Sequence, residues 1–307
     1  NLIKKLDLNE YITNFSKLFA REKPIILEGD INIHYKIISE LSKYNINQPL
    51  SVQNLDSQLM HIQKQGILRV YEIYEFIKII NYFLYLKRFN FEGKLLEWMD
   101  KIIIPNDILK ICEYFDDKAN LKEGVDEDFD NIKQAIYKNK EEIKQSLYKT
   151  INSSKIKPYL VDMQVHFINE QECLLVRGGF NHILSGSVID RSNSGFFYVI
   201  PHSISDLKEK QSDLKNKQEE ILFKLCKEIS HIFERNLLFL KFINKEFDRF
   251  DHYQARIFFS KIGDKNFILP SKKDENRLVD FCHPALSSPK PISIDFSKSV
   301  IMITGVN

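Results

Sequence analysis

The residues best suited to contact a polyanion gather between positions 155 and 196. The cations are Lys155, Lys157, Arg177 and Arg191, the aromatic residues are Tyr159, Phe180 and Phe196, and Asn181 and His182 are polar residues among them. Gly178 and Gly179 follow Arg177 directly, and a glycine turn lets backbone N–H groups approach a phosphate closely. This combination predicts a nucleic-acid contact in this segment.

Acidic residues in the same segment support the opposite interpretation. Asp162, Glu170, Glu172 and Asp190 could cancel the cations and leave no local attraction for phosphate. The whole chain carries 44 Lys plus Arg against 42 Asp plus Glu, a net charge of +2. This balance excludes a strongly basic, histone-like polyanion binder, so a nucleic-acid site must be local.

A second group of cations begins at Lys208 and Lys210 and continues with Lys215 and Lys217. Helical spacing puts Lys208 and Lys215 near one face, where they could add to a DNA contact. Acidic residues alternate with these lysines, and that pattern is also typical of the solvated face of a coiled coil. Lys208 and Lys210 are therefore candidate DNA contacts, with the solvated face as the alternative.

The sequence contains few residues in a pattern that would support nucleophilic catalysis or metal binding. Asp190 and Ser192 could form a catalytic set with His182 or His202, but a turn in which both side chains bond backbone amides explains them more simply. The histidines form no H-x-x-x-H pair, and the four cysteines form no C-x-x-C pair. We expect no catalytic residue, no metal site and reduced thiols, as in a cytoplasmic protein.

Hydrophobic spacing predicts mostly helices. Residues 70–88 repeat a broad apolar face that includes Ile73, Phe76 and Phe83, and Asp30 is a plausible N-cap for an earlier helix. A narrow stripe then runs from residue 128 to 153, and another from 205 to 233. Two such helices suit an antiparallel coiled coil.

Between those two helices the hydrophobic period changes to two. The residues that indicate short strands are Leu174 and Val176, then Ile183 and Val188, then Phe196, Tyr198 and Ile200. Helix resumes near residue 236, and short strands are predicted at 278–281, 292–294 and 300–304. No apolar run reaches the ~20 residues that a membrane span needs.

The predicted fold is therefore mainly α with a small β insertion. It comprises a helical core, two long antiparallel coiled-coil lever helices, a β-rich clamp at their tip and a set of C-terminal strands. The predicted parts are 1–127 (first part of the core), 128–156 (first lever), 157–204 (clamp), 205–235 (second lever), 236–270 (second part of the core) and 271–307 (C-terminal strands).

A resemblance implies that the last part, 271–307, holds the first strands of an incomplete ATPase domain. The segments F-C-H-P-A-L at 281–286, I-S-I at 292–294 and I-T-G-V-N at 303–307 resemble strand motifs of the MutS family, the last of which opens its Walker A loop. The V-I-D-R-S-N-S-G segment at 188–195 and the arginine–glycine turn at 177–179 resemble its second bacterial branch. Cys282 and Val306 depart from the family pattern, which usually has arginine and proline there.

The resemblance implies that the full protein is a cytoplasmic, homodimeric ATPase that uses ATP and Mg²⁺ and carries a C-terminal Smr endonuclease domain. Its implied roles are to bind branched DNA and suppress homologous recombination, and in some members to act on stalled ribosomes through rRNA. Pro291, Ile292, Gly305 and Asn307 match nucleotide-binding positions. We expect the chain to be a piece cut inside the phosphate loop, with no hydrolysis of its own because the P-loop lysine is absent.

The alternative is a coiled-coil scaffold that docks to a protein or ribosomal partner without touching DNA. Branched DNA is the expected partner under the first hypothesis, and no membrane partner is expected under either.

Overall fold

The chain forms two compact units. Residues 1–113 and 230–307 make the first, and residues 114–229 make the second. The computed structural model describes residues 2–262, 267, 269, 277–284, 286, 288–297, 300 and 302. Helices dominate these residues, and the strands form one four-stranded and one two-stranded sheet, both antiparallel. The predicted class, mainly α with a small β part, is confirmed.

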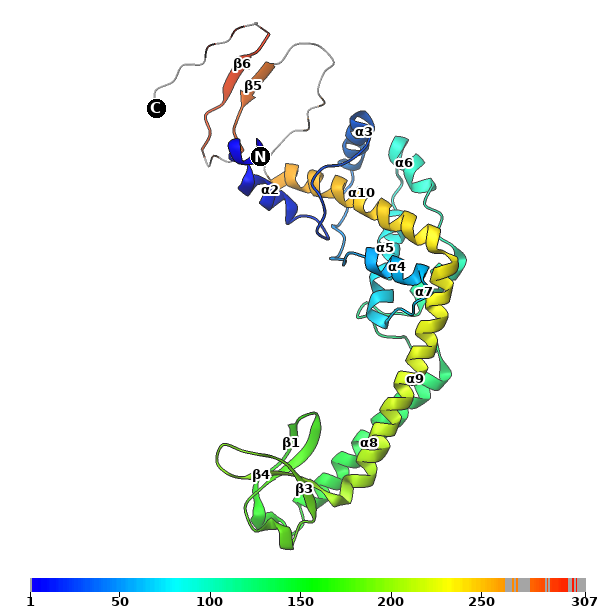
Figure 1. Ribbon diagram of the computed structural model, residues 1–307, viewed down its shortest axis with the longest axis vertical. Coiled ribbons are helices and arrows are strands. Elements are labelled where there is room, and N and C mark those ends of the chain that lie inside the picture. Colours follow the sequence, from blue (N-terminus) through cyan, green and yellow to red (C-terminus); the bar gives the residue numbers. More distant parts are fainter. Residues whose placement is uncertain are drawn as a thin grey trace. The chain divides into compact units, whose positions relative to one another are not determined.

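The first unit contains short helices, one long helix and a strand pair (Figure 1). Its helices are α1 (Leu2–Lys5), α2 (Asn9–Ser16), α3 (Ile31–Leu41), α4 (Asp56–Gln63), α5 (Val70–Leu86), α6 (Gly93–Asp100), α7 (Asn106–Glu113) and α10 (Leu237–Ile262). Asp30 caps α3 as predicted, because its carboxylate accepts a hydrogen bond from the Asn32 N–H at 2.8 Å. Strands β5 (Arg277–Phe281) and β6 (Ile292–Asp295) pair with each other.

Helix α10 holds the first unit together. Phe250 on α10 contacts Phe83 of α5 and Trp98 of α6, with ring centroids 6.5 and 6.0 Å apart. The indole N–H of Trp98 also donates to Glu246 of α10 at 2.5 Å. Residues early and late in the chain therefore share one core, and these aromatic residues are buried because they fill it.

The second unit consists of two long helices and the four-stranded sheet. Helix α8 (Glu127–Ile151) and most of α9 (Ser205–Arg235) lie side by side, since Asn139 of α8 donates to the Leu207 carbonyl at 3.0 Å. The strands are β1 (Leu160–Ile168), β2 (Gln171–Val176), β3 (Gly186–Arg191) and β4 (Phe197–Pro201), in the order β1-β2-β4-β3. One shared hydrophobic core joins α8 to the sheet, with Leu147, Ile151, Leu174 and Val199 in it.

Residues 114–126 group with the second unit, and within them Phe115 pairs with Leu121, with both side chains buried. The structure differs from the strand prediction in two places. Strand β1 was not predicted, and residue 183 lies outside any strand. The six-part division with its lever and clamp names stays a prediction.

The core-facing residues of β4 also differ from the predicted set. Val199 is fully buried and Phe197 packs against the core. Phe196, Tyr198 and Ile200 were expected to form the apolar face, and of these Ile200 also packs against the core. The sequence F-F-Y-V-I-P is apolar on both faces, so a period of two does not choose between them. No helix in the described part of the chain is long and apolar enough to cross a membrane.

Candidate nucleic-acid interface

One end of the four-stranded sheet collects residues from all four strands. The strands are antiparallel, so the start of β1, the end of β2, the start of β4 and the end of β3 fall at this end. The register confirms it: Leu160 pairs with Val176, Val176 with Phe197, and Phe197 with Arg191. The segments that enter β1 and leave β2 and β3 therefore all lie at this end of the sheet.

Those segments carry four of the predicted cations. Lys155 and Lys157 precede β1, Arg177 follows β2, and Arg191 is the last residue of β3. The backbone N–H of Arg177 donates to the Tyr159 carbonyl at 2.7 Å and ties the first two segments together. All four side chains are exposed, and none forms an ion pair with another described residue. We call these four residues the cationic end.

A glycine turn lies beside the cationic end. Gly179 has φ of +84° and begins the 3₁₀ turn Phe180–His182, so this position needs a residue without a side chain. A Cβ at Gly178 would meet no atom within 4 Å, so the fold itself does not require glycine there. Asn181 and His182 follow on the exposed surface. The turn leaves backbone N–H groups open to a phosphate.

Arg191 is held in place by aromatic rings. Its guanidinium carbon lies 4.6 Å from the centroid of the Phe197 ring, and the Phe180 ring lies 5.7 Å from that ring. A cation over an aromatic face is attracted by the ring and keeps its N–H donors at the rim for an anion. Sequence reasoning pointed to Phe196 rather than Phe197, again because both faces of β4 are apolar.

Three of the four acids that could cancel these cations are engaged or lie elsewhere. Glu170 is in the β1–β2 turn at the opposite end of the sheet. Glu172 forms an ion pair with Lys208, and Asp162 contacts His166 Nε2 at 3.0 Å. Asp190 stays near the cationic end and accepts the Arg191 backbone N–H at 2.7 Å. The fold thus moves Glu170 and Glu172 away from the cationic end, whereas Asp162 and Asp190 stay near it.

The two candidate lysines on α9 do not join the cationic end. Lys208 is mostly buried and pairs with Glu172 of β2, toward the other end of the sheet. Lys210 lies 3.7 Å from Glu142 of α8, and both side chains are exposed. Because each lysine already has an acidic neighbour, each attracts phosphate less than an unpaired cation would.

The Asp190–Ser192 segment forms the turn expected for it. Ser192 Oγ accepts the Phe196 N–H at 3.1 Å, and His202 Nδ1 lies 3.0 Å from Ser185 Oγ instead of Ser192. Burial raises the pKa of the Cys173 thiol to about 11, so it is not a nucleophile at neutral pH. Within the described ranges, no group of three or more His, Cys, Asp or Glu residues could hold a metal ion.

Two of the four residues expected to bind nucleotide lie among the described residues. Pro291 is exposed and precedes β6, and Ile292 pairs with Phe281 of β5. Gly305 and Asn307 lie outside the described residues, as does most of the strand predicted at 300–304. The described residues thus contain the border of the expected site and not its phosphate loop.

Comparison with known proteins gives a consistent set of relatives. No protein-family model matches the chain. Proteins named endonuclease MutS2 from two strains of Helicobacter pylori are each 33% identical to it across the whole chain, which corresponds to 41% of their own length. A protein of the same name from Borreliella burgdorferi is 24% identical over 66% of the chain and 26% of its own length. The chain spans less than half the length of these relatives, and the similarity supports a MutS-type protein of a MutS2-like family.

Proposed function

We propose that this MutS2-like chain is a nucleic-acid-binding region, and that the cationic end of its four-stranded sheet contacts the phosphates of branched DNA. The observation that carries the proposal is that Lys155, Lys157, Arg177 and Arg191 lie at one end of the sheet with an exposed glycine turn, without ion-pair partners among the described residues. Phosphate contacts need cations and free N–H donors, and this end of the sheet supplies both.

The geometry favours the backbone of the nucleic acid over its bases. The aromatic rings of Phe180 and Phe197 lie in or against the protein core, where they cannot stack on bases. Arg191 lies over a ring and Lys157 begins a 3₁₀ turn. The contact we propose therefore reads charge and shape, and it has little sequence preference.

The wider proposal concerns the full-length protein. By its likeness to proteins named endonuclease MutS2, we propose a cytoplasmic homodimeric ATPase that binds ATP and Mg²⁺, carries an endonuclease domain and suppresses homologous recombination. Action on stalled ribosomes through rRNA belongs to the same proposal. In this arrangement α8 and α9 would be the levers, and the sheet would be the clamp.

Binding of the chain to a four-way junction, a duplex and a single strand of equal length, across a salt series, tests the proposal. We expect preference for the junction and affinity that falls steeply with salt. Replacing Lys157 and Arg177 with glutamine should weaken binding to all three and lower the salt slope by about two. The control is Lys224→Gln with Lys227→Gln, two exposed lysines of α9 away from the sheet. Equal effects of the two double variants would contradict the assignment.

A second candidate function is docking of a protein or ribosomal partner on the paired helices. Tyr137 of α8 is 67% exposed and Phe223 of α9 is 57% exposed, and large exposed aromatic side chains are typical of contact surfaces. Absence of binding to every DNA form at low salt would favour this alternative.

A further inference from the structure

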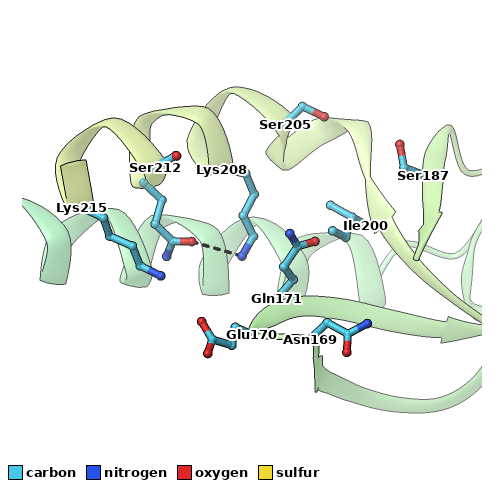
Figure 2. Close-up of a pocket in the computed structure, with 10 residues that line it drawn as sticks. Asn169, Glu170, Gln171, Ser187, Ile200, Ser205, Lys208, Ser212 and Lys215 are labelled. Carbon is cyan, nitrogen blue, oxygen red and sulfur yellow. Dashed lines mark hydrogen bonds between the residues drawn. The ribbon is translucent and has the colours of Figure 1, made fainter. Parts of the chain in front are cut away.

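A polar pocket lies at the end of the four-stranded sheet opposite the cationic end. Its volume is about 460 Å³, which is within the range of small-ligand sites. It is lined by the β1–β2 turn, by Ser187 and Ile200 of β3 and β4, and by the first turns of α9. In Figure 2 the side chains of Lys208 and Lys215 extend from α9 toward the turn that carries Asn169 and Glu170.

The lining is rich in hydroxyl, amide and ammonium groups. Serines, side-chain amides and the two lysines supply most of it, and Ile200 is the apolar exception among the lining residues. Gln211 is only 8% exposed, and its Oε1 accepts a hydrogen bond from Lys208 at 3.3 Å. The NH₂ group of Gln211 is therefore the part of this side chain that can donate to a ligand. A surface with many donors and no aromatic ring does not suit a base, but it suits hydroxyls and an anion.

The two lysines differ in whether they already have an anionic partner. Lys208 pairs with Glu172, which lies outside the lining, and also bonds Gln211. Lys215 is exposed and has no ion pair with any residue that the structure describes. Lys215 is therefore the cation that can take an incoming anion, while Lys208 orients the amide of Gln211.

The β1–β2 turn at the rim of the pocket has an unusual backbone conformation. Asn169 and Glu170 have φ of +49° and +62°, the two-residue hairpin geometry that normally has glycine at its second position. Glutamate in this conformation is strained, and such strain concentrates at functional sites. Its carboxylate is the single acid in the lining, and it would oppose a bound anion.

We propose that this pocket binds a sugar-phosphate group, with the phosphate on Lys215 and the sugar hydroxyls on Gln211 and the neighbouring serines. The group could belong to a nucleic-acid strand, in which case the inference rests on the proposed function, or to a free nucleotide or sugar phosphate, in which case it stands alone. The two sources share one chemistry and differ in what competes for the site.

Calorimetric titration of the 307-residue chain with ribose 5-phosphate, and with ribose as a neutral control, tests the proposal. We expect measurable binding of the phosphate ester, about tenfold weaker in Lys215→Gln and restored in Lys215→Arg. Glu170→Gln should act in the opposite direction and tighten binding several-fold. The matched controls are Lys217→Gln and Glu209→Gln, which remove exposed α9 charges that do not line the pocket.

The outcomes separate the possibilities. Competition by a short single strand assigns the ligand to nucleic acid, and a lack of competition assigns it to a free phosphate ester. The proposed binding site would be overturned if Lys215→Gln and Lys217→Gln changed the affinity equally, or if ribose 5-phosphate did not bind. Neither of these two results affects the cationic end, whose own test uses Lys157 and Arg177 with DNA.

Discussion

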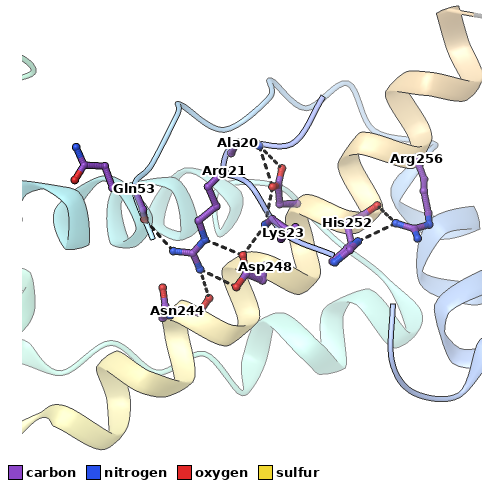
Figure 3. Close-up of polar contacts among 9 residues, drawn as sticks. Ala20, Arg21, Lys23, Gln53, Asn244, Asp248, His252 and Arg256 are labelled. Carbon is purple, nitrogen blue, oxygen red and sulfur yellow. Dashed lines mark hydrogen bonds and ion pairs between the residues drawn. The ribbon is translucent and has the colours of Figure 1, made fainter. Parts of the chain in front are cut away.

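The guanidinium of Arg21 binds both carboxylate oxygens of Asp248, a residue 227 positions later in the chain (Figure 3). Nε and Nη2 each lie 2.8 Å from one oxygen, and the same guanidinium donates to the carbonyls of Gln53 and Asn244. Lys23 adds ion pairs to Asp248 at 2.5 Å and to Asp251 at 2.7 Å. This cluster joins the segment after α2 to α10, so it links the two ends of the first unit.

The cluster also changes the acidity of its members. Burial alone would raise the pKa of Asp248, but the hydrogen bond from Arg21 and the charges of Lys23 and Arg21 lower that pKa overall. Burial raises the pKa of Asp251 despite its contact with Lys23. The backbone N–H of Ala20 donates to both oxygens of Asp251, at 3.2 and 2.9 Å. These contacts make the cluster sensitive to loss of any one cation.

Replacing Arg21 with methionine should destabilise the first unit by about 2 to 3 kcal/mol. Methionine fills similar space but leaves Asp248 with Lys23 as its remaining cation and removes the donor of two carbonyls. The Asp248 side chain is 37% exposed, so water compensates for part of the loss. Urea unfolding measures the change.

The double variant Arg21→Met, Asp248→Asn is the control for that experiment, because it also removes the carboxylate that Arg21 had neutralised. It should recover part of the stability. A single variant that unfolds at the same urea concentration as the original chain would contradict a structural role for this contact.

Stability should fall with acid through His252. Burial, with the charges of Arg256 and Lys23, lowers the pKa of His252 from 6.5 to about 4, and Arg256 donates to its Nδ1 at 3.0 Å. The folded chain then binds fewer protons at this residue than the unfolded chain between pH 6.5 and 4. Stability from this group is complete above pH 6.5 and is lost as the pH falls through that window, by up to about 3 kcal/mol.

Urea unfolding of the original chain and of His252→Gln, at pH 7.5 and 5, measures this effect. The two aspartates titrate in both proteins, so the difference between the two pH dependences isolates His252. Parallel pH dependences would show that His252 is protonated normally in the folded chain.

A buried asparagine should reduce the stability of the helix pair. Asn139 is fully buried between α8 and α9, and its Oδ1 has no hydrogen-bond partner in the described structure, although its NH₂ group donates to Leu207. Replacement by leucine removes an unsatisfied carbonyl and adds apolar contact, so Asn139→Leu should stabilise the second unit by about 1 to 2 kcal/mol. Thermal unfolding measures the gain, and Asn131→Leu on the exposed side of α8 is the control. A lower melting temperature for Asn139→Leu than for the control would contradict the argument.

The two glycines beside Arg177 should respond differently to alanine. Gly179→Ala should destabilise the chain by about 1 kcal/mol, because its φ of +84° is unfavourable for a side chain. Gly178→Ala should leave stability within about 0.5 kcal/mol, since a Cβ there meets nothing within 4 Å, and should weaken DNA binding by shielding the backbone N–H groups. Thermal unfolding and DNA titration of each variant separate the two effects. Loss of stability in Gly178→Ala would show that this glycine is structural.

The helical part of the fold was largely predictable from the sequence. The apolar face of α5, the Asp30 cap and the stripes of α8 and α9 each depend on residues within a few positions of one another, and helical hydrogen bonds are equally local. Strand β1 was missed because L-V-D-M-Q-V-H-F-I alternates poorly, and its partner strand decides its structure.

The candidate site was likewise predictable from the sequence only in part. The residue types that are available follow from the sequence: cations near Arg177, a glycine pair that permits a left-handed turn, and motifs resembling the MutS family. Which charges share one end of the sheet depends on the tertiary structure, because strand register brings Arg191 and Arg177 to one end and Glu170 to the other. It also paired Lys208 with Glu172 and enclosed the pocket beside Lys215. Charge at a point in space depends on long-range pairing, which local sequence patterns do not encode.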